Sequence, residues 1–355
     1  MSSLFAPTTL AGVPLQNHLV MAPLTRSRAI GNVPNALMAE YYGQRADLGL
    51  IITEGTSPAA DGLGYARIPG LFSAEQVAGW KLTTAAAHAG GARIFVQLMH
   101  CGRVAHPANL PAGARVLAPS ALACPGQMWT DTAGMQDHPV PEAMSEADIE
   151  ATIESFVHAA ELAVEAGFDG VEVHGANGYL AEQFLNVGAN QRTDRWGGSV
   201  ENRARFLLEI CRRSVARVGA SRVGVRLSPY GVFNGSVPDA DTDALYLHVA
   251  RELQAIGVAY VHLVDHSSMG TPAPKPELVA GIRAAFTGCL ILSGGYDVAR
   301  AEADLASGKA NLVAFGRAAL ANPGLAGKLK RGEKLNPPDF GTFYTPDAKG
   351  YTDYP

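Results

Sequence analysis

Short apolar segments recur along the chain and are separated by longer stretches with a helical pattern. Each segment is four to seven residues long and rich in β-branched side chains. Such segments are typical of strands that are buried on both faces of a parallel sheet. We expect eight strands, at residues 18–23, 50–53, 92–98, 168–174, 222–228, 259–265, 290–294 and 312–316.

The stretches between these strands repeat apolar residues with a period near 3.6, as amphipathic helices do. The clearest covers residues 146–166, where Ser145 is a favourable N-cap and Gly167 a favourable stop. Further helices are expected at residues 34–46, 77–88, 201–218, 241–256, 277–286, 298–307 and 318–330.

Regular alternation of strand and helix predicts an α/β fold with a parallel sheet, and eight repeats predict a (β/α)8 TIM barrel. A doubly wound sheet would need a G-x-G-x-x-G turn after an early strand, and the sequence has none. We expect one domain over residues 1–355. Residues 1–17 should form a short β-hairpin that closes the bottom of the barrel. The Pro- and Gly-rich residues 101–144 should form a loop or lid after the third strand.

Composition excludes several classes of protein. The 355 residues are 47% hydrophobic, and 28 basic against 33 acidic side chains give a net charge of −5. A mildly acidic chain is a poor partner for nucleic acid. It has no apolar run long enough to span a membrane and no signal-peptide pattern, so we expect a cytoplasmic protein. The four cysteines are far apart, which disfavours zinc and iron–sulfur sites.

Barrel enzymes carry their chemistry at the carboxyl ends of the strands. The seventh and eighth strands end in Gly294, Gly295, Gly316 and Arg317. Loops at these two positions often bind phosphate, because bare backbone amides and an arginine can face its oxygens. A phosphate site would also account for part of the high glycine count of 39.

Two further strand ends indicate what carries the phosphate. Arg226 ends the fifth strand, where a buried cation needs an anionic or electron-rich partner. Gln97, at the end of the third strand, offers an amide donor and acceptor that suit the edge of a pyrimidine-like ring. No acidic cluster marks a metal site. FMN fits this set, whereas a sugar phosphate would leave Gln97 without a role.

The strand ends also form an ordered series of motifs: VMAPLTR, ITEGT, VQLMH, VHGANGYLAEQFL, NQRTDRWGGSVENR, VGVRLSP, LSGGY and VAFGR. Together with the final FYTPDAKGYTDYP, they resemble the old yellow enzyme family of FMN-dependent ene-reductases. The resemblance runs from Leu4 to Pro355. It is strongest to the bacterial members of the N-ethylmaleimide and pentaerythritol tetranitrate reductase type.

The resemblance implies which residues hold a tightly bound FMN. Ala22, Pro23, Leu24 and Thr25 should pack against the flavin, with the Thr25 hydroxyl near its N5/O4 edge. The other implied contacts are Gly55 at the same edge, Gln97 on the pyrimidine side, His174 and Arg226 at the ring, and Gly294, Gly295, Gly316 and Arg317 at the phosphate.

It also implies the substrate site. His174 and Asn177 should donate hydrogen bonds to a carbonyl or nitro oxygen, and Tyr179 should supply a proton to the α-carbon. Tyr65, Met99 and Tyr344 should line the cavity. Some positions depart from relatives: Gly55 replaces a more usual Ala, Asn177 a second His and Met99 a Trp, which should widen the cavity.

The implied activity is NAD(P)H-dependent reduction of the C=C bond in enones, maleimides and related nitro compounds, by a monomer or homodimer. NADPH and NADH remain alternatives as reductant. A nitroester or nitroaromatic reductase would use the same site. A flavin storage or sensing barrel would not need Tyr179, His174 and Asn177. The larger dienoyl-CoA reductase type needs an iron–sulfur cluster that these scattered cysteines do not provide.

Overall fold

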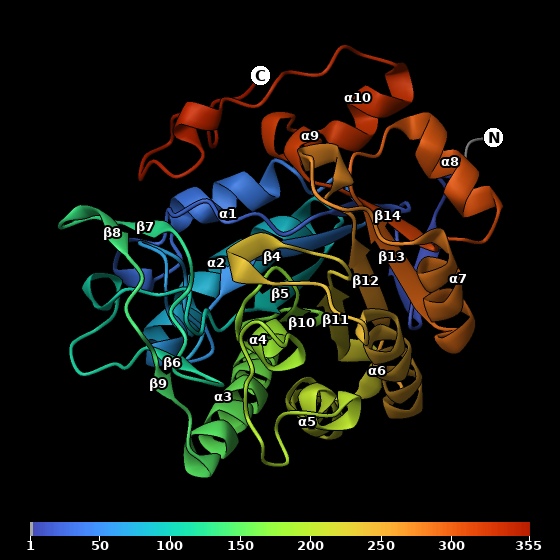
Figure 1. Ribbon diagram of the computed structural model, residues 1–355. Helices are drawn as coiled ribbons and strands as arrows, with labels where there is room; N and C mark the ends of the chain where they lie inside the picture. Colours follow the sequence, from blue (N-terminus) through green and yellow to red (C-terminus); the bar gives the residue numbers. More distant parts are fainter. Residues whose placement is uncertain (1–2) are drawn as a thin grey trace.

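A closed barrel of eight parallel strands forms the centre of the molecule in the computed structural model, which describes residues 3–355 (Figure 1). The strands follow one another in chain order around the barrel, and the last pairs with the first. They are β3 (Leu19–Met21), β4 (Leu50–Thr56), β5 (Arg93–Leu98), β10 (Gly170–Gly175), β11 (Val223–Leu227), β12 (Tyr260–Val264), β13 (Cys289–Ser293) and β14 (Leu312–Phe315). The predicted TIM barrel is confirmed.

Helices surround the barrel on the outside (Figure 1). Seven of the eight predicted helices form close to their expected positions: α1 (Ala36–Gly43), α2 (Ala74–Ala89), α3 (Glu146–Glu165), α5 (Val200–Val218), α6 (Thr242–Ile256), α7 (Pro276–Ala285) and α8 (Val298–Ala306). Helix α3 begins at a complete capping box between Ser145 and Asp148.

The prediction of one helix at residues 318–330 is wrong. The structure has two, α9 (Arg317–Ala321) and α10 (Leu325–Arg331). Pro323 lies between them and has no N–H to donate, and Gly324 adopts a left-handed φ of 64°. A short helix that the pattern did not predict, α4 (Leu180–Leu185), follows strand β10.

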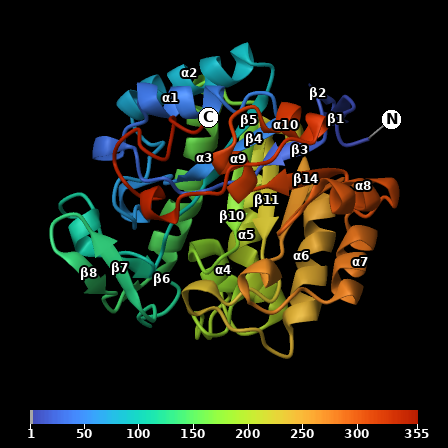
Figure 2. The same cartoon turned by 90° about the horizontal axis from the view of Figure 1, so that it is seen from above.

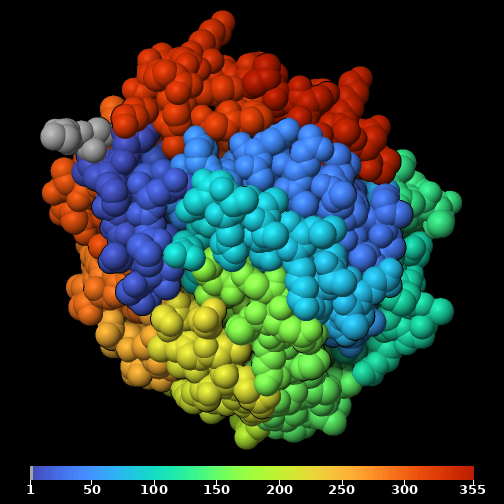
Figure 3. Space-filling view, turned by 180° about the vertical axis from the view of Figure 1, so that it is seen from behind, coloured from blue at the N-terminus to red at the C-terminus, as the bar shows by residue number. Residues whose placement is uncertain are grey.

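The amino-terminal hairpin closes one end of the barrel as predicted. Strands β1 (Thr8–Leu10) and β2 (Val13–Leu15) pair antiparallel. Leu10 and Leu15 are buried against barrel side chains that include Phe95 and Tyr260. Glu302 of α8 accepts the N–H groups of Ser3 and Leu4, which fastens the segment to the barrel. In Figure 3 this dark-blue segment lies on the surface beside orange residues, the part of the chain that contains α7 and α8.

Residues 101–144 form a small ordered subdomain that contains two strand pairs separate from the barrel. Strand β6 (Leu117–Ala118) pairs with β9 (Glu142–Ala143), and β7 (Gln127–Thr130) forms an antiparallel hairpin with β8 (Gly134–Asp137). Figure 2 shows this β7–β8 hairpin and the β1–β2 hairpin on opposite sides of the molecule. The β7–β8 hairpin supplies part of the wall of the cavity described next.

Candidate active site

A cavity of about 820 Å³ opens at the carboxyl ends of the barrel strands. Its wall contains most of the residues predicted for the site: Pro23, Leu24, Thr25, Tyr65, Gln97, Met99, His174, Asn177, Tyr179, Arg226 and Tyr344. The other predicted residues are not part of this wall: Ala22, Gly55, Gly294, Gly295, Gly316 and Arg317. Gly55 instead makes room for Met99, since a Cβ there would lie 2.5 Å from the Met99 sulfur.

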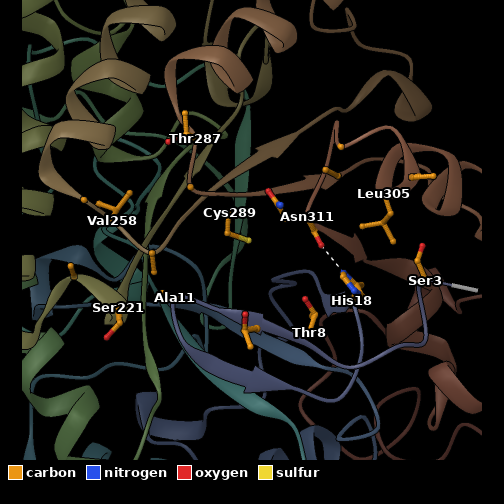
Figure 4. Close-up of a pocket in the computed structure, with 18 of the residues that line it drawn as sticks. Ser3, Thr8, Ala11, His18, Ser221, Val258, Thr287, Cys289, Leu305 and Asn311 are labelled. Atoms are coloured by element: carbon orange, nitrogen blue, oxygen red, sulfur yellow. Dashed lines mark hydrogen bonds between the residues drawn. The ribbon is translucent and has the colours of Figure 1, made fainter.

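A larger cavity, of about 1060 Å³, lies at the opposite end of the barrel, beside the amino-terminal hairpin (Figure 4). Thr8, His18, Ser221 and Asn311 line it. Cys289 also faces it, but burial raises the pKa of that thiol to about 12, so the thiolate is not populated. Residues at this end of a TIM barrel serve stability, and catalysis belongs to the carboxyl end.

The turn after β10 carries two of the predicted residues, Asn177 and Tyr179, and has an unusual backbone. Asn177 and Gly178 are consecutive left-handed residues, with φ of 60° and 75°. A side chain at Gly178 would place its Cβ 2.5 Å from the carbonyl oxygen of Phe233. Only glycine fits there, and strain of this kind persists where the surroundings hold it.

Hydrogen bonds fix Asn177 on three sides. Its N–H donates to Ser228 Oγ at 2.9 Å, and its carbonyl accepts from Asn234 Nδ2 at 2.8 Å. Its side-chain Oδ1 lies 2.8 Å from Nε2 of His266. Burial lowers the pKa of His266 to about 4, so the ring is neutral and donates from Nε2. The Asn177 amide therefore presents its N–H groups to the cavity.

His174 is also a donor without a protein partner. Its side chain is buried, and no group among residues 3–355 bonds its Nδ1. Burial and the neighbouring Arg226 hold the pKa of His174 well below 6.5, so its imidazole is neutral. A buried polar atom of this kind requires a partner that the protein itself does not provide.

Tyr179 stands beside His174, with their ring centroids 4.9 Å apart. Its hydroxyl donates to that of Tyr65 at 3.1 Å. Burial raises the pKa of Tyr179 above its usual value, so the phenol keeps its proton across the physiological range. Tyr179 is thus a protonated phenol beside the His174 imidazole, in the same cavity as the Asn177 amide.

A buried chain of hydrogen bonds begins at Gln97 in the wall of the cavity. Gln97 Nε2 donates to Glu172 at 2.8 Å, and the other Glu172 oxygen lies 2.9 Å from His262 Nδ1. His262 Nε2 lies 3.0 Å from Ser293 Oγ. The carboxylate fixes the Gln97 amide and faces the buried charge of Arg226, whose Nε has no bonding partner in the described chain. Arg226 and Gln97 therefore fit the polar edge of a flavin.

The ends of β13 and β14 fit a phosphate. Gly294 has φ of 129°, and a Cβ there would lie 2.1 Å from the carbonyl oxygen of Asp265. Gly295 also has a positive φ, of 62°. Gly316 precedes α9, whose first residue is the exposed Arg317. Strands β13 and β14 are hydrogen-bonded neighbours, so their bare backbone ends lie side by side.

Replacing Gly294 by Ala should lower the melting temperature of the protein and weaken its binding of FMN. The added methyl collides with backbone, which cannot move as a flexible side chain can. Gly308→Ala is the matched control, since Gly308 has φ of 73° but no atom within 4 Å of an added Cβ. Thermal melts and FMN titrations of both variants measure the difference. Equal losses in the two would show that backbone strain alone is responsible.

Exposed apolar side chains gather at the mouth of the cavity. They come from three separate segments and comprise Trp129, Met135, Met269, Phe340 and Tyr344. Arg67 links two of these segments, because it pairs with Asp131 of the β7–β8 turn and donates to the Tyr344 carbonyl at 2.8 Å. Clustered apolar exposure of this kind marks a binding surface.

These features together fit a barrel protein that holds a phosphorylated ring cofactor beside a pocket of hydrogen-bonding side chains. The family model described as "NADH:flavin oxidoreductase / NADH oxidase family" matches residues 3–336. The chain belongs to this family.

Relatives of known name agree with this assignment. The chain is 41% identical over 354 residues to the "Probable flavin mononucleotide-dependent alkene reductase" of Leishmania infantum, covering 98% of this chain and 96% of that protein. Morphinone reductase superposes with a TM-score of 0.96 at 42% identity, over 100% of this chain and 96% of that chain. An old yellow enzyme homologue of Zymomonas mobilis superposes with a TM-score of 0.95 at 38% identity, over 99% of each chain.

The assignment confirms the predicted old yellow enzyme family, an FMN-dependent oxidoreductase and a nicotinamide reductant. One structure similar to this chain is morphinone reductase in complex with tetrahydroNAD, with a TM-score of 0.94 and 42% identity over 100% of this chain and 98% of that one. No helix among the described residues is long and apolar enough to cross a membrane.

Proposed function

We propose that this protein uses NAD(P)H to reduce the C=C bond of α,β-unsaturated carbonyl compounds at the cavity around His174, Asn177 and Tyr179. The observation that carries the proposal is the grouping in one cavity of His174, whose buried Nδ1 has no partner among the described residues, the Asn177 amide and the protonated Tyr179 phenol. Relatives named alkene reductase and 12-oxophytodienoate reductase support the same chemistry.

FMN, when bound, supplies the hydride that the substrate receives. Arg226 and Gln97 would hold its polar ring edge, and Pro23, Leu24 and Thr25 line the same cavity. Gly294, Gly295, Gly316 and Arg317 would hold its phosphate; Ala22 and Gly55 stay predictions from the family.

The chain's own residues activate the substrate. His174 and the Asn177 amide bind its carbonyl oxygen and stabilise the negative charge that develops there as the β-carbon accepts hydride. The Tyr179 hydroxyl then gives its proton to the α-carbon. Tyr65 holds that hydroxyl in place. The apolar mouth suits an uncharged substrate whose body extends beyond the carbonyl group.

The same donors suit the two oxygens of a nitro group, so nitroester and nitroaromatic reduction is the second candidate. Maleimides present the same conjugated carbonyl as enones. A cytoplasmic location, a monomeric or dimeric state and the choice between NADPH and NADH stay predictions.

Product analysis tests the proposal. Under anaerobic conditions, FMN-loaded protein with NADPH or NADH should convert 2-cyclohexenone to cyclohexanone. Release of nitrite from a nitroester, with no reduction of enones or maleimides, would favour the second candidate instead. If the protein oxidised NAD(P)H in air but reduced no enone, maleimide or nitro compound, both candidates would be contradicted.

Arg317→Ala tests the phosphate assignment. A lost charge-assisted hydrogen bond is worth about 1.5–3 kcal/mol, so the affinity for FMN should fall roughly 10- to 100-fold. Riboflavin, which has no phosphate, is the matched control ligand, and its affinity should not change. Fluorescence titration measures both. An equal loss for riboflavin would place Arg317 away from the phosphate.

A further inference from the structure

Glu182, on the short helix α4, lies directly behind the turn that carries Asn177. Its side chain is buried, with 2% of the residue's surface exposed. One oxygen accepts the N–H of Gly178 at 2.5 Å. The other accepts the hydroxyls of Ser228, at 2.7 Å, and Tyr246, at 2.9 Å.

Both left-handed residues of the turn are tied to this carboxyl group. Gly178 bonds it directly, and the N–H of Asn177 bonds Ser228 Oγ, which in turn donates to Glu182. Both backbone N–H groups of the turn that aims the Asn177 amide into the cavity are therefore tied, directly or through Ser228, to one acidic side chain. No role for Glu182 is predicted from the sequence, although this acid lies within the VHGANGYLAEQFL motif.

The groups that bond Glu182 are all neutral. Burial raises the pKa of Glu182 to about 7, and its hydrogen bonds work against that rise. The titratable and charged groups around it are Tyr246 on α6, Tyr230 after β11, and Arg203 on α5 with its partners Asp239 and Asp241.

We propose that ionised Glu182 is a positioning residue for the carbonyl-binding turn, and that its protonation loosens the hold on Asn177. An ionised carboxylate only accepts hydrogen bonds, so it accommodates all three donors. A protonated carboxyl group carries an O–H on one of its oxygens. That O–H then faces other donors, either the Ser228 and Tyr246 hydroxyls or the Gly178 N–H. Hydroxyls can rotate away, but Ser228 must then change the bond that it makes with Asn177.

The inference rests on the proposed function, and the oxidative half-reaction tests it. Pre-reduced, FMN-loaded protein is mixed without oxygen with 2-cyclohexenone, which has no titrating group, from pH 5 to 9. The wild-type rate should fall roughly tenfold in all as the pH drops through about 7, the pKa of Glu182, and should then level off. His174 and His266 are neutral in that range and Tyr179 stays protonated, so they add no titration there.

Two variants separate positioning from mere structural support. Glu182→Gln offers one acceptor oxygen instead of two, so its rate at pH 8 should be roughly tenfold lower, chiefly through kcat, and the fall below pH 7 should disappear. Tyr246→Phe removes one donor to the carboxylate, which raises its pKa, so the fall should begin at higher pH. If Glu182→Gln does not fold, the Tyr246→Phe profile decides alone.

Glu54→Gln tests whether the titration belongs to Glu182. Burial also raises the pKa of Glu54 to about 7, but its partners are Arg26 and Tyr42. Its pH profile should keep the wild-type midpoint. An unchanged profile in Glu182→Gln and Tyr246→Phe, or loss of the titration in Glu54→Gln, would overturn the inference. Absence of enone reduction in the wild type at pH 8 would instead contradict the proposed function.

Discussion

Replacing Tyr179 by Phe should slow the reduction of 2-cyclohexenone by about 10²- to 10⁴-fold, the usual contribution of a positioned general acid. Reduction of the FMN-loaded protein by NADPH or NADH should change little, because that step needs no proton from Tyr179. The phenol is held by Tyr65 at 3.1 Å and keeps its proton because burial raises its pKa. Stopped-flow absorbance separates the two half-reactions.

Tyr65→Phe is the matched control for this prediction. It removes the partner of the Tyr179 hydroxyl but leaves the acid itself, so its effect should be smaller. Equal slowing of both half-reactions in Tyr179→Phe would show that Tyr179 shapes the cavity and is not the proton donor.

His174→Ala should lower the rate of enone reduction about 10²- to 10³-fold, since it removes one of the two donors to the substrate oxygen. The same variant should bind phenols more weakly, seen as loss of their long-wavelength charge-transfer band with the oxidised flavin. Because His174 is neutral when buried, this loss should not depend on pH between 6 and 8.

His266→Ala is the comparison variant. His266 bonds the oxygen of the Asn177 amide, so this variant leaves both proposed donors to the substrate, His174 and the Asn177 N–H groups, in place. It should retain more activity than His174→Ala. A phenol band of unchanged strength in His174→Ala would contradict the contact assigned to this imidazole.

The strands and their ends could be predicted because both are local patterns. Buried strands in a parallel barrel are continuous apolar runs, and the polar residues that follow them meet at one end of the barrel. The break between α9 and α10 also has a local sequence signal, because Pro323 and Gly324 are unfavourable inside a helix. Periodicity alone extended the predicted helix across these two residues.

The supporting groups could not be predicted in this way, since their roles depend on contacts between distant parts of the chain. His266 lies 89 positions from Asn177, and His262 lies 90 positions from Glu172. Glu172 was visible as an acid within an apolar strand, and His266 as a polar residue just after the sixth strand. Their partners become evident only when the barrel closes.

If one cavity accepts electrons from NAD(P)H and passes them to an enone, both steps should be seen in the flavin absorbance. Two successive anaerobic additions to the FMN-loaded protein separate them. Addition of NADPH or NADH should bleach the flavin absorbance, and 2-cyclohexenone should then restore it with one cyclohexanone formed per flavin. A flavin that is not bleached, or that stays bleached after the enone is added, would contradict the account.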